Sequence, residues 1–203
     1  MDEQVLINKV DLKSVVDEMF LVLTAKEKEV VIRRFSLDNK PRETLEKIGH
    51  HFNVTRERIR QIENIALLKL RRHISNSHLR YVNRAAKDIL IENGGVMKES
   101  LLIAETLNSI GKKSELDGSI IRLALSIDGE LAKNDRSNEF EPAWHFEKIS
   151  INNIKSITNS AYNILKKKGE IIAFADLFKM IKQLDLFFNK QPTLELIKSC
   201  LCI

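Results

Sequence analysis

The chain has 203 residues, of which 43% are hydrophobic and 30% are charged. This length accommodates two or three small domains and leaves no room for a large catalytic core. The formal net charge of +5 favours an anionic partner. No apolar run approaches the roughly 20 residues of a membrane span, and an N-terminus with Asp2 and Glu3 lacks a signal-peptide layout. We therefore expect a cytoplasmic protein without membrane contact.

The sequence offers few residues in patterns that are typical of metal sites, disulfides or catalytic sites. Cys200 and Cys202 are the only cysteines, and their close spacing does not suit a disulfide framework, so we expect reduced thiols. The histidines are scattered, apart from His50 and His51, which a helix would point about 100° apart. The sequence shows no glycine-rich phosphate loop and no nucleophile-base-acid order. It predicts no metal, no cofactor, no small-molecule substrate and no enzymatic activity.

Residues 1–22 are predicted to be a helical lead-in. After them, Thr24 and Glu27 form a capping box, in which each side chain accepts a hydrogen bond from the other residue's backbone N–H. The helix that this box opens places Val30, Val31, Arg34 and Phe35 along one side, and residues 37–41 break the pattern.

Two further helices follow in close succession. Residues 44–52 form a short amphipathic segment, and residues 52–55 form a polar turn. Thr55 is a suitable N-cap for a longer helix. In that helix an apolar stripe recurs at three- and four-residue spacing: Ile59, Ile62, Ala66 and Leu70. A short helix, a tight turn and a longer basic helix are the order of a helix-turn-helix motif.

The opposite stripe of the longer helix is polar. It carries side-chain types that form hydrogen bonds with base edges in the major groove: Arg56, Glu57, Arg60, Gln61 and Asn64. A solvated surface helix that binds no DNA also carries charged residues, so the surrounding sequence has to support the DNA-binding interpretation. Basic residues concentrate in this part of the chain: Lys40, Arg42, Arg56, Arg58, Arg60, Lys69, Arg71 and Arg72. This local concentration predicts double-stranded DNA as the partner.

Residues 23–72 resemble region 4 of the sigma-70 family, the module that recognises the promoter −35 element, and the stretch TRERIRQIE at residues 55–63 is the most specific part. The resemblance implies base contacts by Arg56, Glu57 and Gln61. It also implies phosphate contacts by Arg58 and Arg60 and by Thr44 and Leu45 at the start of the first helix. We expect Lys40 and Arg42 to contact phosphates as well.

The sequence departs from the region 4 pattern at two positions. Ser36 stands where the family commonly has glycine. Leu68 stands where a basic residue is frequent, which puts in doubt a contact that the family makes with upstream activators.

A second domain is predicted over residues 82–149, after a helical connector at residues 73–81. Helices are expected at residues 84–93, ended by Gly94 and Gly95, at residues 98–110, and at residues 119–127. Residues 130–133 and 143–147 then form two short strands joined by a polar loop. Three helices and a β-hairpin make a winged helix, so the predicted fold class is mainly α, with a helix-turn-helix domain, winged-helix domains and a small β-hairpin.

This second segment resembles the HARE helix-turn-helix domain, best known at the N-terminus of the bacterial RNA polymerase delta subunit. The resemblance rests on the Glu-Asn-Gly-Gly ending of the first helix, the passage at residues 124–129 and the single Trp144. Trp144 and Phe146 are interpreted as hairpin residues that close the core, in preference to a base-stacking role.

A third segment, residues 156–203, is predicted to be a second, wingless copy. Residues 161–169 parallel residues 86–94, and residues 200–203 parallel residues 124–127. Cys200 and Cys202 then occupy core positions of a third helix. Lys166 to Lys168 could form a phosphate patch, although cations also suit a helix C-terminus.

Two functional hypotheses follow. In the first, the chain is a sigma-like transcription regulator that recognises −35-type promoter DNA and associates with RNA polymerase core at the flap of the β subunit. In the second, it mainly binds polymerase and competes with or assists a true sigma factor, with little DNA specificity of its own. Only about 20 residues precede region 4, so we expect that the chain cannot open a promoter alone.

Overall fold

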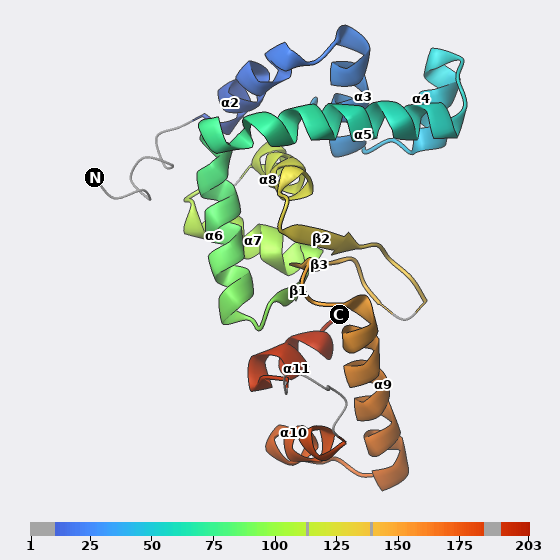
Figure 1. Cartoon of the computed structure of the whole chain (residues 1–203), viewed down its shortest axis with the longest axis vertical. Helices are drawn as coiled ribbons and strands as arrows, with labels where there is room; N and C mark the ends of the chain where they lie inside the picture. Colours follow the sequence, from blue (N-terminus) through green and yellow to red (C-terminus); the bar gives the residue numbers. More distant parts are fainter. Residues whose placement is uncertain (1–10, 113, 139, 185–191) are drawn as a thin grey trace. The chain divides into compact units, whose positions relative to one another are not determined.

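A computed structural model describes residues 11–112, 114–138, 140–184 and 192–203. The fold is mainly α, with one small antiparallel sheet, as the sequence predicts (Figure 1). The chain divides into two compact units. The first contains the described residues of Met1–Lys87 together with Ile103–Gly129, and the second contains those of Asp88–Leu102 and Glu130–Ile203. The boundary passes through two helices of the predicted second domain, and the predicted domain limits remain a prediction.

The first unit begins with the helices α2 (Leu12–Met19), η1 (Phe20–Val22) and α3 (Ala25–Phe35). The predicted capping box opens α3: the Glu27 N–H donates to Thr24 Oγ1 at 3.3 Å, and the Thr24 N–H donates to Glu27 Oε2 at 2.8 Å. Val30, Val31 and Phe35 are buried, which confirms the predicted inner side of this helix.

Helices α4 (Leu45–Phe52) and α5 (Arg56–His73) follow, at the predicted positions. The helical connector expected at residues 73–81 is instead interrupted. It consists of the 3₁₀ turn η2 (Ile74–Asn76), in which Ser77 N–H donates to Ile74 O, and α6 (Leu79–Glu92) then begins several residues earlier than predicted.

Helix α8 (Glu115–Ile127) also starts earlier than predicted, because Ser114 and Asp117 form a second capping box that the sequence analysis did not use. Helix α7 (Glu99–Ser109) ends before Gly111, whose φ of 67° suits the left-handed turn there. The end of α6 is likewise followed by Gly94 and Gly95 with positive φ, as predicted.

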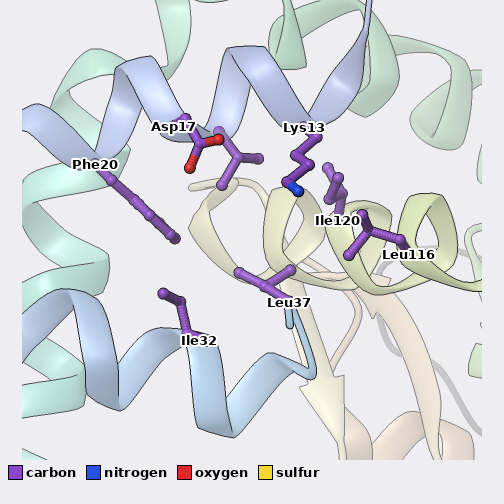
Figure 2. Close-up of a pocket in the computed structure, with 8 residues that line it drawn as sticks. Lys13, Asp17, Phe20, Ile32, Leu37, Leu116 and Ile120 are labelled. Atoms are coloured by element: carbon purple, nitrogen blue, oxygen red, sulfur yellow. The ribbon is translucent and has the colours of Figure 1, made fainter. Parts of the chain in front are cut away.

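A small apolar cavity of about 40 Å³ lies in the first unit, between α2, α3 and α8 (Figure 2). It exceeds the space that one water molecule needs, but it is far smaller than the ~300 Å³ at which small-molecule sites begin. It is therefore a packing defect rather than a ligand site. Its lining consists of Lys13, Val16, Asp17, Phe20, Ile32, Leu37, Leu116 and Ile120.

The sheet lies in the second unit, and its strands are β1 (Val96–Lys98), β2 (Leu131–Asn134) and β3 (Ala143–Phe146), in the order β1-β3-β2. The predicted hairpin is confirmed as β2 and β3, and Lys133 pairs with Trp144 in its register. Strand β1 was not predicted from the sequence, and it adds a third antiparallel strand to the predicted hairpin. Trp144 and Phe146 are buried, as expected of residues that close the core.

Among the described residues, the second unit also contains the helices α9 (Ile151–Lys168), α10 (Phe174–Gln183) and α11 (Leu194–Cys200). They enclose an apolar cluster that contains Ile154, Ile157 and Ile197. Cys200 belongs to this cluster, and burial raises the pKa of its thiol to about 12. Cys202 lies beyond the end of α11 and is exposed, so the predicted core position is wrong for this residue. The relation of this segment to the preceding one remains a prediction.

Candidate nucleic-acid interface

Helices α4 and α5 meet through a tight turn. Asn53 ends α4 in the left-handed region, with a φ of 52°, and the Val54 N–H donates to the Gly49 carbonyl at 3.0 Å. Asparagine tolerates this conformation because its short polar side chain bonds locally. Thr55 then caps α5 by accepting from the Arg58 N–H at 3.2 Å. The turn therefore fixes the direction in which α5 leaves α4.

A small apolar core holds the two helices together. Its buried members come from α3, α4 and α5: Val30, Ile48, Ile59 and Ile62. Leu45, Phe52 and Val54 pack against them while remaining partly exposed. The apolar stripe that the sequence predicts for α5 is thus the inner face of a helix-turn-helix core.

Two ion pairs fasten α5 to α3. Arg34 Nε lies 3.1 Å from Glu63 Oε1, and both side chains are largely buried, with exposed fractions of 16% and 11%. Lys69 Nζ lies 2.8 Å from Glu27 Oε2, on the same carboxylate that completes the capping box of α3. Removing one partner of the Arg34–Glu63 pair leaves an uncompensated, largely buried charge. Both contacts join α5 to α3 and restrict the orientation of α5.

The first two turns of α5 carry the predicted DNA-contacting groups on an exposed face. Arg56, Glu57 and Gln61, the predicted base-contacting residues, are all exposed, and so are Arg58 and Arg60. The structure thus brings these five residues together on one helix.

Several of these groups bind one another in the DNA-free structure. Arg60 donates to both oxygens of Glu57, at 2.7 and 2.8 Å, and Arg58 donates to Gln61 Oε1 at 3.1 Å. The hydrogen bond from Arg60 lowers the pKa of the Glu57 carboxyl, and the same contact raises the pKa of Arg60. Contact with bases and phosphates would require these exposed pairs to rearrange, at a small cost because solvent screens them.

The other predicted phosphate contacts lie at the start of α4 and in the loop before it. Thr44 is the N-cap of α4 and accepts from the Lys47 N–H at 3.2 Å. Leu45 is half-buried against the core, so its backbone N–H is the group that it can offer to a phosphate. Lys40 and Arg42 are exposed, and Lys40 Nζ lies 3.1 Å from Asp38 Oδ2.

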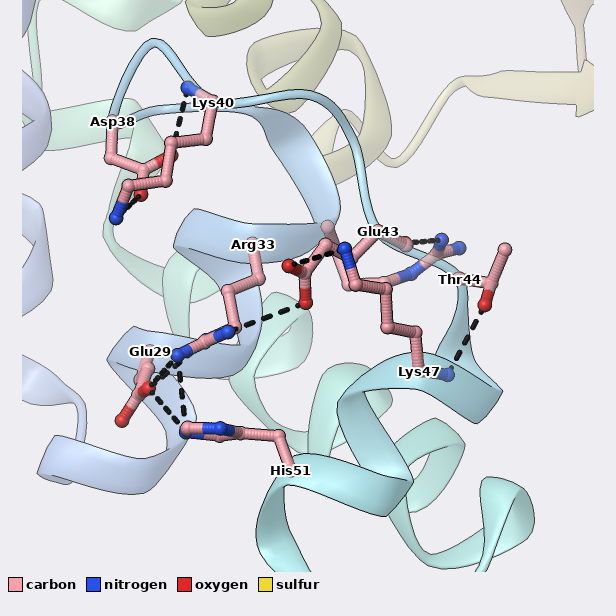
Figure 3. Close-up of polar contacts among 9 residues, drawn as sticks. Glu29, Arg33, Asp38, Lys40, Glu43, Thr44, Lys47 and His51 are labelled. Atoms are coloured by element: carbon pink, nitrogen blue, oxygen red, sulfur yellow. Dashed lines mark hydrogen bonds and ion pairs between the residues drawn. The ribbon is translucent and has the colours of Figure 1, made fainter.

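A polar network that the sequence analysis missed holds the start of α4 against α3 (Figure 3). Arg33 binds Glu29 at 2.7 Å and Glu43 at 3.3 Å, Lys47 binds Glu43 at 3.2 Å, and His51 Nε2 lies 3.1 Å from Glu29. The hydrogen bond from Arg33 lowers the pKa of Glu29. The i, i+4 spacing of Glu29 with Arg33 and of Glu43 with Lys47 was the available signal.

An exposed, basic second helix on a packed helix-turn-helix core is the arrangement found in helix-turn-helix DNA-binding proteins. Comparison with known proteins agrees. Residues 20–72 match the family model "Sigma-70, region 4", which confirms the prediction of a region 4 domain in this segment.

Two of the curated relatives that the chain resembles are sigma factors. The chain is 48% identical over 64 residues to the RNA polymerase sigma factor SigA of Lactococcus lactis subsp. cremoris, a match that covers 32% of this chain and 18% of the relative. It is 50% identical over 70 residues to SigA of Microcystis aeruginosa, covering 34% of this chain and 16% of the relative. The chain thus spans less than a fifth of the length of these proteins. No solved structure matches it.

No group of three or more His, Cys, Asp or Glu side chains in the described part of the chain could hold a metal ion. No helix among those residues is long and apolar enough to cross a bilayer.

Proposed function

We propose that this protein is a sequence-specific DNA-binding transcription regulator that recognises −35-type promoter DNA through α5. The observation that carries the proposal is the cluster of Arg56, Glu57 and Gln61 on the exposed first turns of a helix that is itself fixed by a buried core and by ion pairs. The match of residues 20–72 to region 4 and the similarity to SigA proteins support it.

In this proposal the two groups of residues have different tasks. Arg56, Glu57 and Gln61 contact base edges, where arginine suits guanine, glutamate accepts from the cytosine amino group and glutamine suits adenine. Phosphate contacts come from Thr44 and Leu45 at the start of α4, from Lys40 and Arg42 before it, and from Arg58 and Arg60 on α5. They position the protein without specifying sequence.

Direct binding to DNA without polymerase tests the proposal. Fluorescence anisotropy with a labelled duplex that carries a −35 element should give tighter binding than a duplex of the same composition with that element scrambled. Binding should weaken steeply as salt rises, because phosphate contacts release counterions. Equal affinity for the two duplexes at every salt concentration would rule out sequence-specific recognition by this chain.

A second candidate is an RNA polymerase-binding modulator with little DNA specificity. The apolar residues exposed on α5, Ile65 and Leu68, favour it because a DNA backbone offers them no partner. The proposed polymerase site is the flap of the β subunit. Co-purification with polymerase core that survives nuclease treatment would support this role, particularly if the duplex assay shows no sequence preference.

A further inference from the structure

The segment that follows the helix-turn-helix motif, residues 82–149, was predicted to be a winged helix and is called here the winged segment. In a helix-turn-helix arrangement its third helix, α8, would be the one that enters a DNA groove, and such a helix needs an exposed polar face. Helix α8 lacks that face along most of its length. Eight of its residues are buried: Gly118, Ser119, Ile120, Ile121, Leu123, Ala124, Leu125 and Ile127.

Helices of the first unit enclose α8 on several sides. Leu116 and Ile120 line the small cavity together with Val16 of α2 and Ile32 of α3 (Figure 2). On another side, Gly118 lies so close to α7 that an added Cβ would be 3.5 Å from Ile103 Cγ2. The helix is therefore a buried packing element of the unit that contains the region 4 motif.

The C-terminal end of α8 is fastened to α5 and α6. Arg71 of α5 donates to the carbonyls of Ile127 and Asp128, both at 3.2 Å. These carbonyls lie at a helix C-terminus, where unpaired C=O groups and the helix dipole favour a cation. Asn83 of α6 donates to the Ala124 carbonyl at 3.0 Å. Helix α5, which carries the proposed DNA-contacting residues, thus has direct hydrogen bonds to α8.

The loop between β2 and β3, which would be the wing, is also engaged within its own unit. Phe140 is 6% exposed and belongs to the apolar cluster that contains Ile154 and Ile157 of α9. The Glu141 N–H donates to the Ile203 carbonyl at 2.7 Å. Helix α8 and the C-terminal part of the loop are therefore used for packing, whereas residues 135–138 of the loop are exposed.

We propose that α8 of the winged segment is a structural part of the DNA-binding unit, which holds α5 in place, and that the winged segment is not a second DNA reader. The statement that the winged segment does not read DNA rests on the function proposed above. The coupling between α8 and α5 is a property of the folded chain by itself.

Hydrogen exchange of the full chain tests the coupling. Ile120→Ala enlarges the cavity beside α2 and α3, and amide exchange in α3 and α5 should become about tenfold faster or more, because local opening free energies follow buried packing. The matched control is Ile157→Ala, which removes the same atoms from a fully buried isoleucine of the other unit. It should accelerate exchange in α9, α10 and α11 and leave α5 unchanged.

Unchanged exchange in α3 and α5 of Ile120→Ala, with acceleration confined to α8, would overturn the proposal. If amide exchange becomes faster throughout the Ile120→Ala variant, Arg71→Lys tests the coupling instead. This substitution keeps the positive charge but removes the planar guanidinium group that donates to two carbonyls. It should accelerate exchange at the C-terminal end of α5, whereas Arg72→Lys on the adjacent residue should not. Equal behaviour of the two lysine variants would contradict the proposed support.

Hydrogen exchange with a −35 duplex tests the second half of the proposal. Added DNA should slow exchange at the start of α4 and α5 and leave residues 135–138 of the loop unchanged. Protection of that loop by the duplex would show that the winged segment contacts DNA and would contradict the proposal. If no duplex binds at all, the proposed function fails, while the comparison of Ile120→Ala with Ile157→Ala still decides the role of α8.

Discussion

Ser36 ends helix α3 in the left-handed region, with a φ of 58°. A side chain with a Cβ in this conformation costs about 1–2 kcal/mol, and glycine avoids that cost. This left-handed conformation explains why glycine is common at this position in the region 4 family. This chain has the same left-handed turn with a serine, so the backbone is strained there.

Ser36→Gly should therefore stabilise the protein. We expect an increase of roughly 0.5–1 kcal/mol in the free energy of unfolding, since relief of strain exceeds the added flexibility of the unfolded chain. Urea denaturation measures it. Ser36→Ala keeps the Cβ and should show no such gain, and an equal gain in both variants would mean that the hydroxyl group, not the backbone, is the source.

Protonation of the Glu27 carboxyl should make the free energy of unfolding depend on pH. Burial raises the pKa of its carboxyl, but hydrogen bonds from Lys69 and from the Thr24 N–H outweigh burial, so the pKa lies below its ordinary value of 4.5. A carboxyl whose pKa is depressed by folding contributes stability above its unfolded pKa and loses it as the pH falls through the folded value.

We expect Glu27→Gln to be less stable than the wild type at pH 7, and the difference should shrink as the pH falls from about 4.5 towards the lower folded pKa. Thermal unfolding at a series of pH values measures this difference. Glu18→Gln on the exposed face of α2 is the control for the removal of one carboxylate. A constant gap between wild type and Glu27→Gln at all pH values would contradict the linkage.

At the scale of elements, the turn between α4 and α5 depends on Gly49. A Cβ at this position would lie 2.7 Å from the Val54 carbonyl oxygen, which real Cβ contacts do not permit, so the turn would have to open. The turn sets the direction of α5, and its opening would displace the proposed DNA-contacting residues together.

Gly49→Ala should lower the free energy of unfolding by about 1–3 kcal/mol, the usual cost of overpacking, and should weaken duplex binding as well. Gly129→Ala is a matched control, because an added Cβ there has no heavy atom within 4 Å. Chemical denaturation and anisotropy titration test both variants. If Gly49→Ala binds and unfolds like the control, the close approach is not what fixes the turn.

Sequence reasoning located the elements that depend on local signals. The capping box at Thr24, the polar turn before Thr55 and the apolar stripe of α5 are all found where predicted, because each is encoded within a few neighbouring residues. Strand β1 was missed because three residues give no alternation to detect, and its partner β3 lies far along the chain.

Polar contacts between residues far apart in the sequence could not be predicted either. The pairing of Arg34 with Glu63 and the hydrogen bonds from Arg71 to the end of α8 join residues 29 to 57 positions apart. For the candidate site, residue types on one helix face could be predicted, and the i, i+3 spacing of Glu57 and Arg60 allows them to pair. The two hydrogen bonds between them depend on rotamers that only the structure specifies.

At the scale of the whole molecule, the region 4 match occupies residues 20–72, and the chain spans only 16–18% of the length of the SigA relatives described above. The proposed role, regulation of transcription, rests on duplex recognition by α5. Recognition of a duplex in the major groove does not by itself separate the strands.

We expect this 203-residue chain to give no specific runoff transcript when it is the sole sigma-like component with polymerase core on a linear promoter template. Output should change when a housekeeping sigma factor is also present. A reaction with that sigma factor and no added chain is the control. A transcript that starts at a defined site without the housekeeping factor would contradict the proposed role.

Glu57 can distinguish recognition of bases by α5 from binding to the DNA backbone alone. Because Arg60 binds Glu57 in the free protein, Glu57→Ala also releases Arg60, so the substitution should be made in both the wild type and the Arg60→Ala background. The measurement is duplex affinity across a panel in which each base pair of the −35 element is varied in turn. We predict that Glu57→Ala loses discrimination at one base pair by ~1–3 kcal/mol in both backgrounds and keeps it elsewhere. An equal loss of affinity on every duplex, with discrimination intact, would contradict base recognition by α5.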